Sequence, residues 1–157
     1  MIQTILSKDA VQRLLDAAYR FDSDVVRAGY VLFDCDGRKE IKTIAETETY
    51  VFEQHCPVGG YACGKVFRAD LFRKICFPQG YWFEDTINSF LVSFLAKSVV
   101  LLPECLYYYR QHPKSITYVA GHEKKVVDTY WITELVMQEH ELLKLPQDRA
   151  FFDTFIK

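Results

Sequence analysis

The stretch Phe77-Pro78-Gln79-Gly80-Tyr81-Trp82-Phe83-Glu84-Asp85-Thr86 decides how the centre of this chain folds. Beyond it, apolar residues recur with the spacing i, i+3, i+4, i+7 and i+8, which is typical of a helix buried along one side. These residues are Ile87, Phe90, Leu91, Phe94 and Leu95. The sequence therefore predicts an aromatic loop with Pro and Gly, followed by a central helix over residues 84–97.

Two adjacent carboxylates, Glu84 and Asp85, lie in the first turn of this predicted helix. The unpaired N–H groups and the positive dipole end of a helix start hold carboxylates ionised. One interpretation is a helix cap. The other is a fixed base that takes a proton from a bound hydroxyl group. In that case Tyr81, Trp82 and Phe83 would shield the encounter from water.

Before the central helix, the patterns predict a helix, a hairpin and a short helix. Ser7 can cap a helix over residues 10–19, whose core stripe would be Val11, Leu14, Leu15 and Ala18. A strand over residues 24–33, a turn at Asp36-Gly37 and an exposed return strand and loop over residues 38–50 follow. Gly59-Gly60 then breaks the chain, and residues 68–75 form a short helix that begins near Arg68.

After the central helix, two strands and two helices are expected. The strands cover residues 99–102 and, past Pro103, residues 106–110, and His112-Pro113 turns the chain. A long amphipathic helix over residues 123–143, with Val127, Trp131 and Leu135 on its core face, ends at Pro146. A last short helix over residues 147–156 would bury Phe151, Phe152 and Phe155. The fold class is thus α/β, or α+β if this chain is a piece of a longer domain taken alone, with a few strands packed against amphipathic helices.

Composition excludes several classes of protein. The chain has 157 residues, of which 50% are hydrophobic and 15% aromatic, so it is long and apolar enough for one ordered domain. The net charge of −2 gives no basic surface for nucleic acid. The aromatic rings suit either a core or sugar recognition. Apolar runs such as Val99–Leu102 are far too short to span a bilayer, and we expect no signal peptide.

The chain has five cysteines, which are Cys35, Cys56, Cys63, Cys76 and Cys105. Because their number is odd and no two of them form a C-x-x-C pair, they are expected to be reduced thiols in the core. We therefore expect a cytoplasmic protein, with at most peripheral contact at the inner face of a membrane. His55-Cys56 with Cys63 is a poor zinc set because adjacent side chains rarely converge on one ion. The pairs Asp22-Ser23-Asp24 and Asp34-Cys35-Asp36 have the Asp-x-Asp spacing of a cation site, but turn and cap roles fit them better.

Several motifs in order resemble the second half of glycosyltransferase family 2 enzymes of GT-A fold. In that family a K-x-F-R-x-x-x-F segment is followed by F-P-x-G, a Glu-Asp pair, a helix, an apolar strand and a Y-Y-Y-R…S-I segment. This chain has Lys65 to Phe72, Phe77 to Gly80, Glu84-Asp85, Val99 to Leu102, Tyr107 to Arg110 and Ser115-Ile116. The likeness runs from about Asp9 to about Thr117, so it divides the chain into an acceptor-side portion, 1–120, and a helical extension, 121–157.

The resemblance implies roles for particular residues. Asp85 matches the carboxylate that deprotonates the acceptor hydroxyl, and Glu84 is its supporting neighbour. Lys65, Tyr81, Trp82, Arg110 and Ser115 would bind substrate, with Arg110 neutralising phosphate charge. Lys65 does not belong to a P-loop, because Val66 follows it where Ser or Thr is needed. His112 is the candidate for a metal ligand, against a solvated turn histidine.

The family's nucleotide-binding half, which ends in a metal-binding Asp-x-Asp motif, has no counterpart before these motifs. We therefore expect a portion of an inverting glycosyltransferase that transfers a sugar from a nucleotide-sugar donor to a glycan or lipid-linked acceptor. A divalent metal, Mn²⁺ or Mg²⁺, would belong to the full enzyme and would not be bound by this chain, which alone would be inactive. The alternative is a non-catalytic acceptor-binding or assembly module that docks on a nucleotide-binding partner or self-associates through an exposed face.

Overall fold

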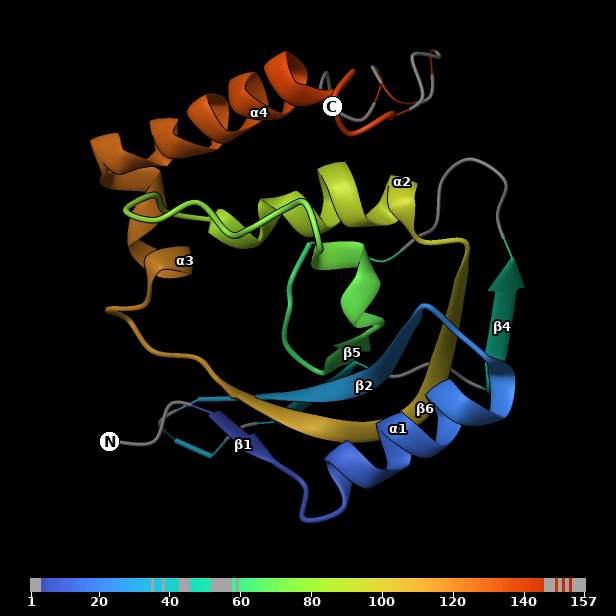
Figure 1. The fold of residues 1–157 in the computed structure, drawn as a ribbon. Coiled ribbons are helices and arrows are strands. Elements are labelled where there is room, and N and C mark those ends of the chain that lie inside the picture. Colours follow the sequence, from blue (N-terminus) through green and yellow to red (C-terminus); the bar gives the residue numbers. More distant parts are fainter. Residues whose placement is uncertain are drawn as a thin grey trace.

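The computed structural model describes residues 4–34, 36–37, 39–42, 46–51, 58, 60–145, 149, 151 and 153. In this part of the chain, a six-stranded mixed sheet is packed against helices on both faces. The strands are β1 (Thr4–Leu6), β2 (Val25–Phe33), β3 (Lys39–Lys42), β4 (Glu48–Val51), β5 (Lys65–Phe67) and β6 (Ser98–Arg110). Figure 1 shows α1 (Ala10–Phe21) on one face of the sheet and the other helices on the opposite face.

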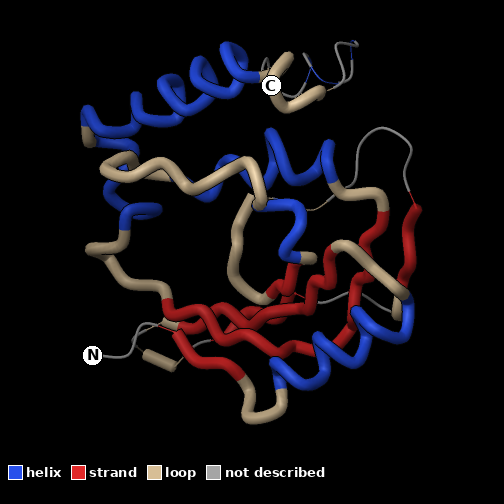
Figure 2. Tube along the Cα trace, in the orientation of Figure 1, coloured by secondary structure: helices blue, strands red, loops and turns tan. Residues whose placement is uncertain are grey.

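Two long parallel strands form the centre of the sheet. β2 pairs with β6 along its whole length, from Val25 opposite Val99 to Phe33 opposite Arg110. The outer edge of β6 pairs with β4 and β1, and the outer edge of β2 pairs with β5 and β3, all antiparallel. Each central strand thus has two short strands along its free edge (Figure 2).

The two strands expected at residues 99–102 and 106–110 are one continuous strand. Pro103 lies where the register between β2 and β6 shifts, since Leu102 is opposite Ala28 and Cys105 is opposite Gly29. A proline has no N–H to donate to the ladder, and such an irregularity lets the strand continue past it. The predicted hairpin is confirmed: β2 and β3 pair antiparallel, and Gly37 has a φ of +78° in the turn between them.

Three apolar clusters hold the layers together. The first packs α1 on the sheet, with Ala10, Leu14 and Ala17 against alternate strand residues such as Val26 and Val100. The second lies on the other face, where Val25 and Val99 pack against Val92 and Ala96. Neighbouring residues of β2 and β6 thus belong to clusters on opposite faces, because successive side chains of a strand point to opposite sides of the sheet.

The third cluster joins the central helical segment to α4 (Asp128–Glu139), so α4 forms an outer layer above α2 (Figure 1). Its buried members include Ile87, Leu91, Phe94, Ile132, Val136 and Phe151. The helical residues after 121 therefore share one core with the segment that begins at Glu84. Phe151 is buried as expected, whereas Phe152, Phe155, Pro146 and Gln147 lie outside the described residues.

The expected helix faces are corrected in part. On α1, Leu14 is buried and Ala18 packs against the core as expected, but Val11 is 55% exposed and Leu15 36%, and Ala10 and Ala17 are buried instead. On α4 and the turn before it, the expected core residues Val127, Trp131 and Leu135 are exposed, and the residue that follows each of them is buried. Ser7 is not the cap of α1 either: Asp9 is its N-cap residue, and no side chain caps it.

The remaining helical elements are short. They are the 3₁₀ turns η1 (Ala69–Phe72), η2 (Glu84–Thr86), η4 (Ala120–His122) and η5 (Lys124–Val127), the π-helical turn η3 (Asn88–Val92), and the short helices α2 (Ser93–Leu95) and α3 (Ile116–Val119). η1 confirms the predicted short helix that begins next to Arg68. The predicted central helix is present as a helical segment, but it consists of η2, η3 and α2 in succession rather than a regular α-helix.

Candidate functional site

The start of the central helical segment has an unusual backbone conformation. Phe83 has φ 59° and ψ 35°, a left-handed conformation that is costly for a residue with a bulky side chain. It precedes η2, and Thr86 closes the turn through its N–H bond to the Phe83 carbonyl, at 2.9 Å. η2 is a 3₁₀ turn and not the regular α-helical start that was expected, although it continues directly into η3 and α2.

Asp85 lies half-buried, while Glu84 is exposed. Burial and the negative charge of Glu84 raise the pKa of the Asp85 carboxyl above its usual value. The backbone N–H of Ala62 donates a hydrogen bond to this carboxylate and, with the charge of Lys65, partly opposes the rise in pKa. Desolvation is thus the larger effect, so the helix start does not lower the pKa of Asp85 as expected.

Lys65 lies on β5 and is paired with Arg27 of β2. Burial, and then the charge of Arg27, lower the pKa of Lys65 to about 8, against opposing effects of Cys63 and Asp85. Its ammonium group donates to the carbonyl of Tyr61. The structure thus brings Asp85 and Lys65 together, with pKa values shifted toward each other, as is common at functional sites.

Asn88 connects the segment before β5 to the helical segment that begins at Glu84, through a hydrogen bond. This side chain is fully buried, and its Nδ2 donates to the Gly60 carbonyl at 2.9 Å. Its Oδ1 has no hydrogen-bond partner in the structure as described. Sequence reasoning missed Asn88, although a lone polar residue inside an apolar helical stripe was a usable signal. With the Ala62–Asp85 bond, it fixes residues 60–62 against the carboxylates.

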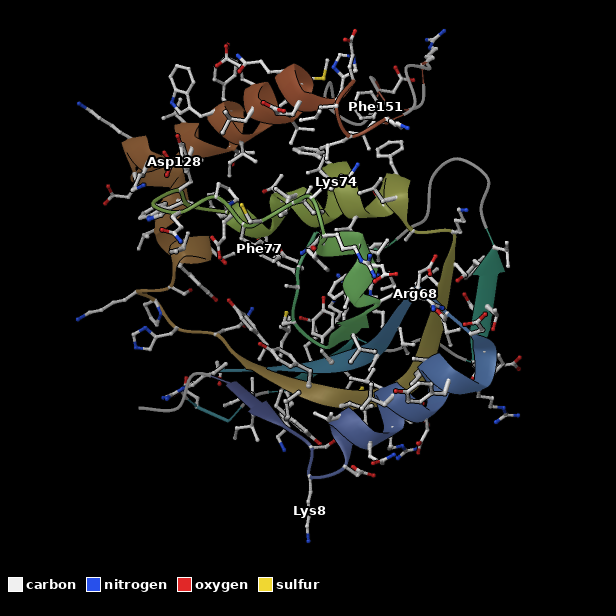
Figure 3. All side chains as sticks on the ribbon, viewed as in Figure 1. Lys8, Arg68, Lys74, Phe77, Asp128 and Phe151 are labelled. Carbon is white, nitrogen blue, oxygen red and sulfur yellow. The ribbon has the colours of Figure 1, made fainter. Side chains whose placement is uncertain are left out.

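The aromatic loop is held by the helical extension. The Trp82 N–H donates to Asp128 at 2.7 Å, and Lys125 Nζ binds both the Gly80 carbonyl, at 2.7 Å, and the Asp128 carboxylate, at 2.6 Å. Figure 3 shows Asp128 at the start of α4, beside this loop. Tyr81 is exposed, and Trp82 packs edge-on against Phe83. Sequence reasoning also missed Lys125 and Asp128, whose only local signal was an i, i+3 ion pair.

The residues predicted at the end of β6 form a turn of their own. Arg110 is the last residue of the strand, opposite Phe33. His112 Nδ1 accepts the Lys114 N–H at 3.0 Å, and Ser115 Oγ donates to the His112 carbonyl at 2.8 Å. None of these contacts involves Asp85 or Lys65. The Lys114 bond occupies the Nδ1 lone pair, and a metal-ligand role for His112 stays a prediction.

The two Asp-x-Asp pairs have structural roles. Asp22 and Asp24 both accept hydrogen bonds from Arg68, at 2.8 and 2.7 Å. Asp34 accepts the Asp36 N–H at 2.9 Å and shapes the hairpin turn. Among the described residues no group of three or more His, Cys, Asp or Glu side chains could hold a metal ion. These residues therefore do not fit the divalent metal that the resemblance implies.

The cysteines correct a further expectation. Cys63 and Cys76 are free and exposed, and Cys105 is partly buried, so the first two are not core thiols. Cys35, Cys56 and His55, which were weighed as turn or zinc residues, lie outside the described residues.

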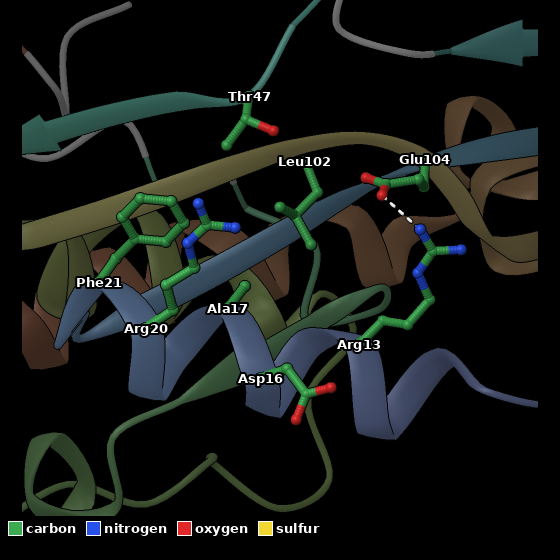
Figure 4. Close-up of a pocket in the computed structure, with 8 residues that line it drawn as sticks. All are labelled: Arg13, Asp16, Ala17, Arg20, Phe21, Thr47, Leu102 and Glu104. Carbon is green, nitrogen blue, oxygen red and sulfur yellow. Dashed lines mark hydrogen bonds and ion pairs between the residues drawn. The ribbon is translucent and has the colours of Figure 1, made fainter.

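A pocket of about 310 Å³ lies between α1 and β6, and none of the predicted site residues lines it (Figure 4). It is lined by Arg13, Asp16, Ala17, Arg20, Phe21, Thr47, Leu102 and Glu104. Its two guanidinium groups are balanced by two carboxylates, and Arg13 binds Glu104 directly at 2.6 Å. This arrangement favours no ligand charge.

The chain matches no known protein-family model, and no curated protein matches it. Within the described residues, no helix is long and apolar enough to cross a membrane.

Proposed function

We propose that this chain is the acceptor-side portion of an inverting glycosyltransferase of GT-A fold, with Asp85 as the base. The observation that carries the proposal is the half-buried Asp85 carboxylate, whose pKa is raised by burial and whose charge interacts with Lys65. The order of the sequence motifs supplies the reaction class. The mixed α/β fold is compatible with it and does not by itself identify a function.

In the proposed reaction, an acceptor hydroxyl group is hydrogen-bonded to Asp85. Its oxygen attacks the anomeric carbon of the donor sugar while its proton passes to the carboxylate. The bond from the anomeric carbon to the nucleoside diphosphate breaks on the opposite side, so the configuration is inverted. A raised pKa makes the Asp85 carboxylate a stronger base than an ordinary surface aspartate.

Lys65 and the aromatic loop would support this chemistry by position. The ammonium group of Lys65 is close enough to interact electrostatically with Asp85 and would attract an anionic or hydroxyl-bearing substrate. Tyr81 and Trp82, held by Asp128, would border the acceptor. The left-handed backbone conformation of Phe83 is energetically unfavourable, and such conformations are often retained at functional sites.

The test is transferase activity of the Asp85→Asn variant in the protein as expressed in its host, with a panel of nucleotide sugars and glycan or lipid-linked acceptors. We expect a loss of about 10²-fold or more in turnover, the usual contribution of a general base. Asp16→Asn, which changes an exposed carboxylate on α1, is the matched control and should leave turnover unchanged. Full activity of Asp85→Asn would show that Asp85 is not the base.

One observation favours the non-catalytic alternative, an acceptor-binding or assembly module. α4 and the turn before it present Val127, Trp131 and Leu135 to solvent, with 46%, 45% and 42% of each residue exposed. A helix with apolar residues on two faces usually has a second partner. Sedimentation equilibrium at high protein concentration tests self-association, and a strictly monomeric chain would count against this form of the alternative.

A further inference from the structure

A second pocket, of about 410 Å³, lies between η1 and the end of α2. Neither Asp85 nor Lys65 lines it, so it is separate from the candidate site and independent of the proposed function. Its volume lies in the range of pockets that bind small molecules.

One wall of this pocket is rigidly built around Arg68. Arg68 Nε donates to Asp24 at 2.7 Å, and its Nη2 donates to Asp22 at 2.8 Å. The second Asp24 oxygen accepts the Lys97 backbone N–H at 2.7 Å, so this carboxylate ties η1 to the starts of β2 and β6. The Asp24 side chain is only 17% exposed. The guanidinium group is therefore held in place before any ligand arrives, while Nη1 takes no part in these bonds.

The charges around the pocket are unbalanced. Its walls carry four cationic side chains and two carboxylates, and Asp22, which binds Arg68 from outside the lining, adds a third carboxylate, which leaves a net charge of +1. Arg73 is paired with Asp70 at 2.9 Å, and Arg68 is paired with Asp24. The ammonium groups of Lys74 and Lys97 have no hydrogen bond or ion pair within the described residues. Two positive charges are therefore available at the rim.

The rest of the lining is apolar. Leu71, Ile75, Leu95 and Leu143 border the pocket, and each is partly exposed to solvent. They pack against the two core clusters on this face of the sheet. A hydrocarbon chain placed on them would remove apolar surface from water, which favours binding.

We propose that this pocket binds a phosphate monoester of an alkyl chain. The phosphate group, with a charge close to −2 above its second pKa of about 6, matches the two unpaired lysines and the free edge of Arg68. The alkyl chain lies on the leucine and isoleucine side chains. A carboxylate with the same chain neutralises only one of the two charges and binds more weakly. A soluble alkyl phosphate and the head of a membrane phospholipid share this chemistry.

The test is calorimetric titration of the chain with n-octyl phosphate at pH 7.5 and low salt. We expect it to bind about tenfold or more tightly than inorganic phosphate, octanoate or octanol, because only the ester uses both halves of the pocket. Binding to phosphatidic acid vesicles, and not to phosphatidylcholine vesicles, would identify a membrane as the source of the ligand. Octyl phosphate binding without vesicle binding would identify a soluble ester.

Variants separate this site from general surface charge. The double variant Lys74→Ala/Lys97→Ala should weaken octyl phosphate binding by about tenfold, while Lys8→Ala should change it less than about twofold. All three lysines are exposed, so the variants should keep the fold, and Lys8 lies on the α1 side of the sheet (Figure 3). The proposal is overturned if octyl phosphate does not bind, if octanol or inorganic phosphate binds equally well, or if the double variant binds unchanged.

Discussion

The backbone N–H of Trp82 donates a 2.7 Å hydrogen bond to the carboxylate of Asp128, which lies 46 residues later in the chain. Lys125 binds the same carboxylate and the carbonyl of Gly80, so one ion pair holds the segment 80–82. Asp128 is only 8% exposed, and removing its carboxylate would leave the partly buried Trp82 N–H without this hydrogen bond. The position of the aromatic loop therefore depends on the start of α4.

The first prediction concerns this contact. Asp128→Ala should release the loop, increase the exposure of Trp82 and lower the stability of the fold at neutral pH. Fluorescence quenching of Trp82 in a Trp131→Phe background measures the release, since these are the two tryptophans of the chain. Glu134→Ala, on the same helix, is the control. Unchanged quenching of Trp82 in Asp128→Ala would show that the loop is held by other contacts.

The same contact has a pH signature. The Lys125 hydrogen bond and then the Trp82 N–H lower the pKa of Asp128 below its usual value. A carboxyl group with a lowered pKa in the folded state adds stability above its unfolded pKa, and this stability is lost as the pH falls through the folded value. Asp128→Asn should therefore lower the free energy of unfolding by its full amount at pH 7, and this difference from the natural protein should shrink below about pH 4. Urea unfolding of both proteins across this pH range measures the difference.

The second prediction tests the left-handed conformation of Phe83. Phe83→Gly and Phe83→Ala both remove the ring, so they differ mainly in backbone preference. At φ 59° glycine is favoured over alanine, and the Gly variant should be more stable by about 1 kcal/mol. At most other loop positions alanine is the more stable of the two, because glycine makes the unfolded chain more flexible. Urea denaturation of the pair measures the difference, and a more stable Ala variant would contradict it.

Local patterns predicted the elements of this fold better than their buried faces. The strand at β2, the Asp36-Gly37 turn and the helix at α1 each follow from short-range signals, and all three are present. The face of α1 was half right, with Leu14 and Ala18 in the core, and that of α4 was wrong, because both helices carry apolar residues on two sides and only the packing partner selects one. On α4, for example, Ile132 is buried and its neighbour Trp131 is exposed.

The candidate site was predictable only in part. Asp85 and Lys65 were identified from the order of motifs, and the structure brings them together. The contribution of Asp128 could not be predicted, because its partner is a backbone N–H that carries no sequence signal. The irregular helical start was also unforeseen, since the i, i+3, i+4 pattern is compatible with a regular helix and does not reveal the π-helical turn at residues 88–92.

The third prediction concerns Lys65. Its pKa is lowered from 10.5 to about 8, so between these values the unfolded chain binds more protons than the folded chain and stability rises with pH. Below pH 8 the charged, partly buried ammonium group costs stability. Lys65→Met should therefore stabilise the fold at pH 7, and its advantage should decline between about pH 8 and pH 10.5. Lys8→Met, at an exposed position, is the control and should show no such decline.

The fourth prediction separates a functional role of Asp85 from a structural one. Burial raises the pKa of this carboxyl, so its ionised form costs stability above the folded pKa, and the cost disappears below the unfolded value of 3.8. Asparagine keeps an oxygen that can accept the Ala62 N–H but carries no charge. Asp85→Asn should therefore be more stable than the natural protein at pH 7, and the gain should vanish as the pH falls below 3.8. A variant that gains stability while losing transfer activity is expected of a group kept for chemistry. Loss of stability at pH 7 would instead indicate that the carboxylate mainly supports the fold.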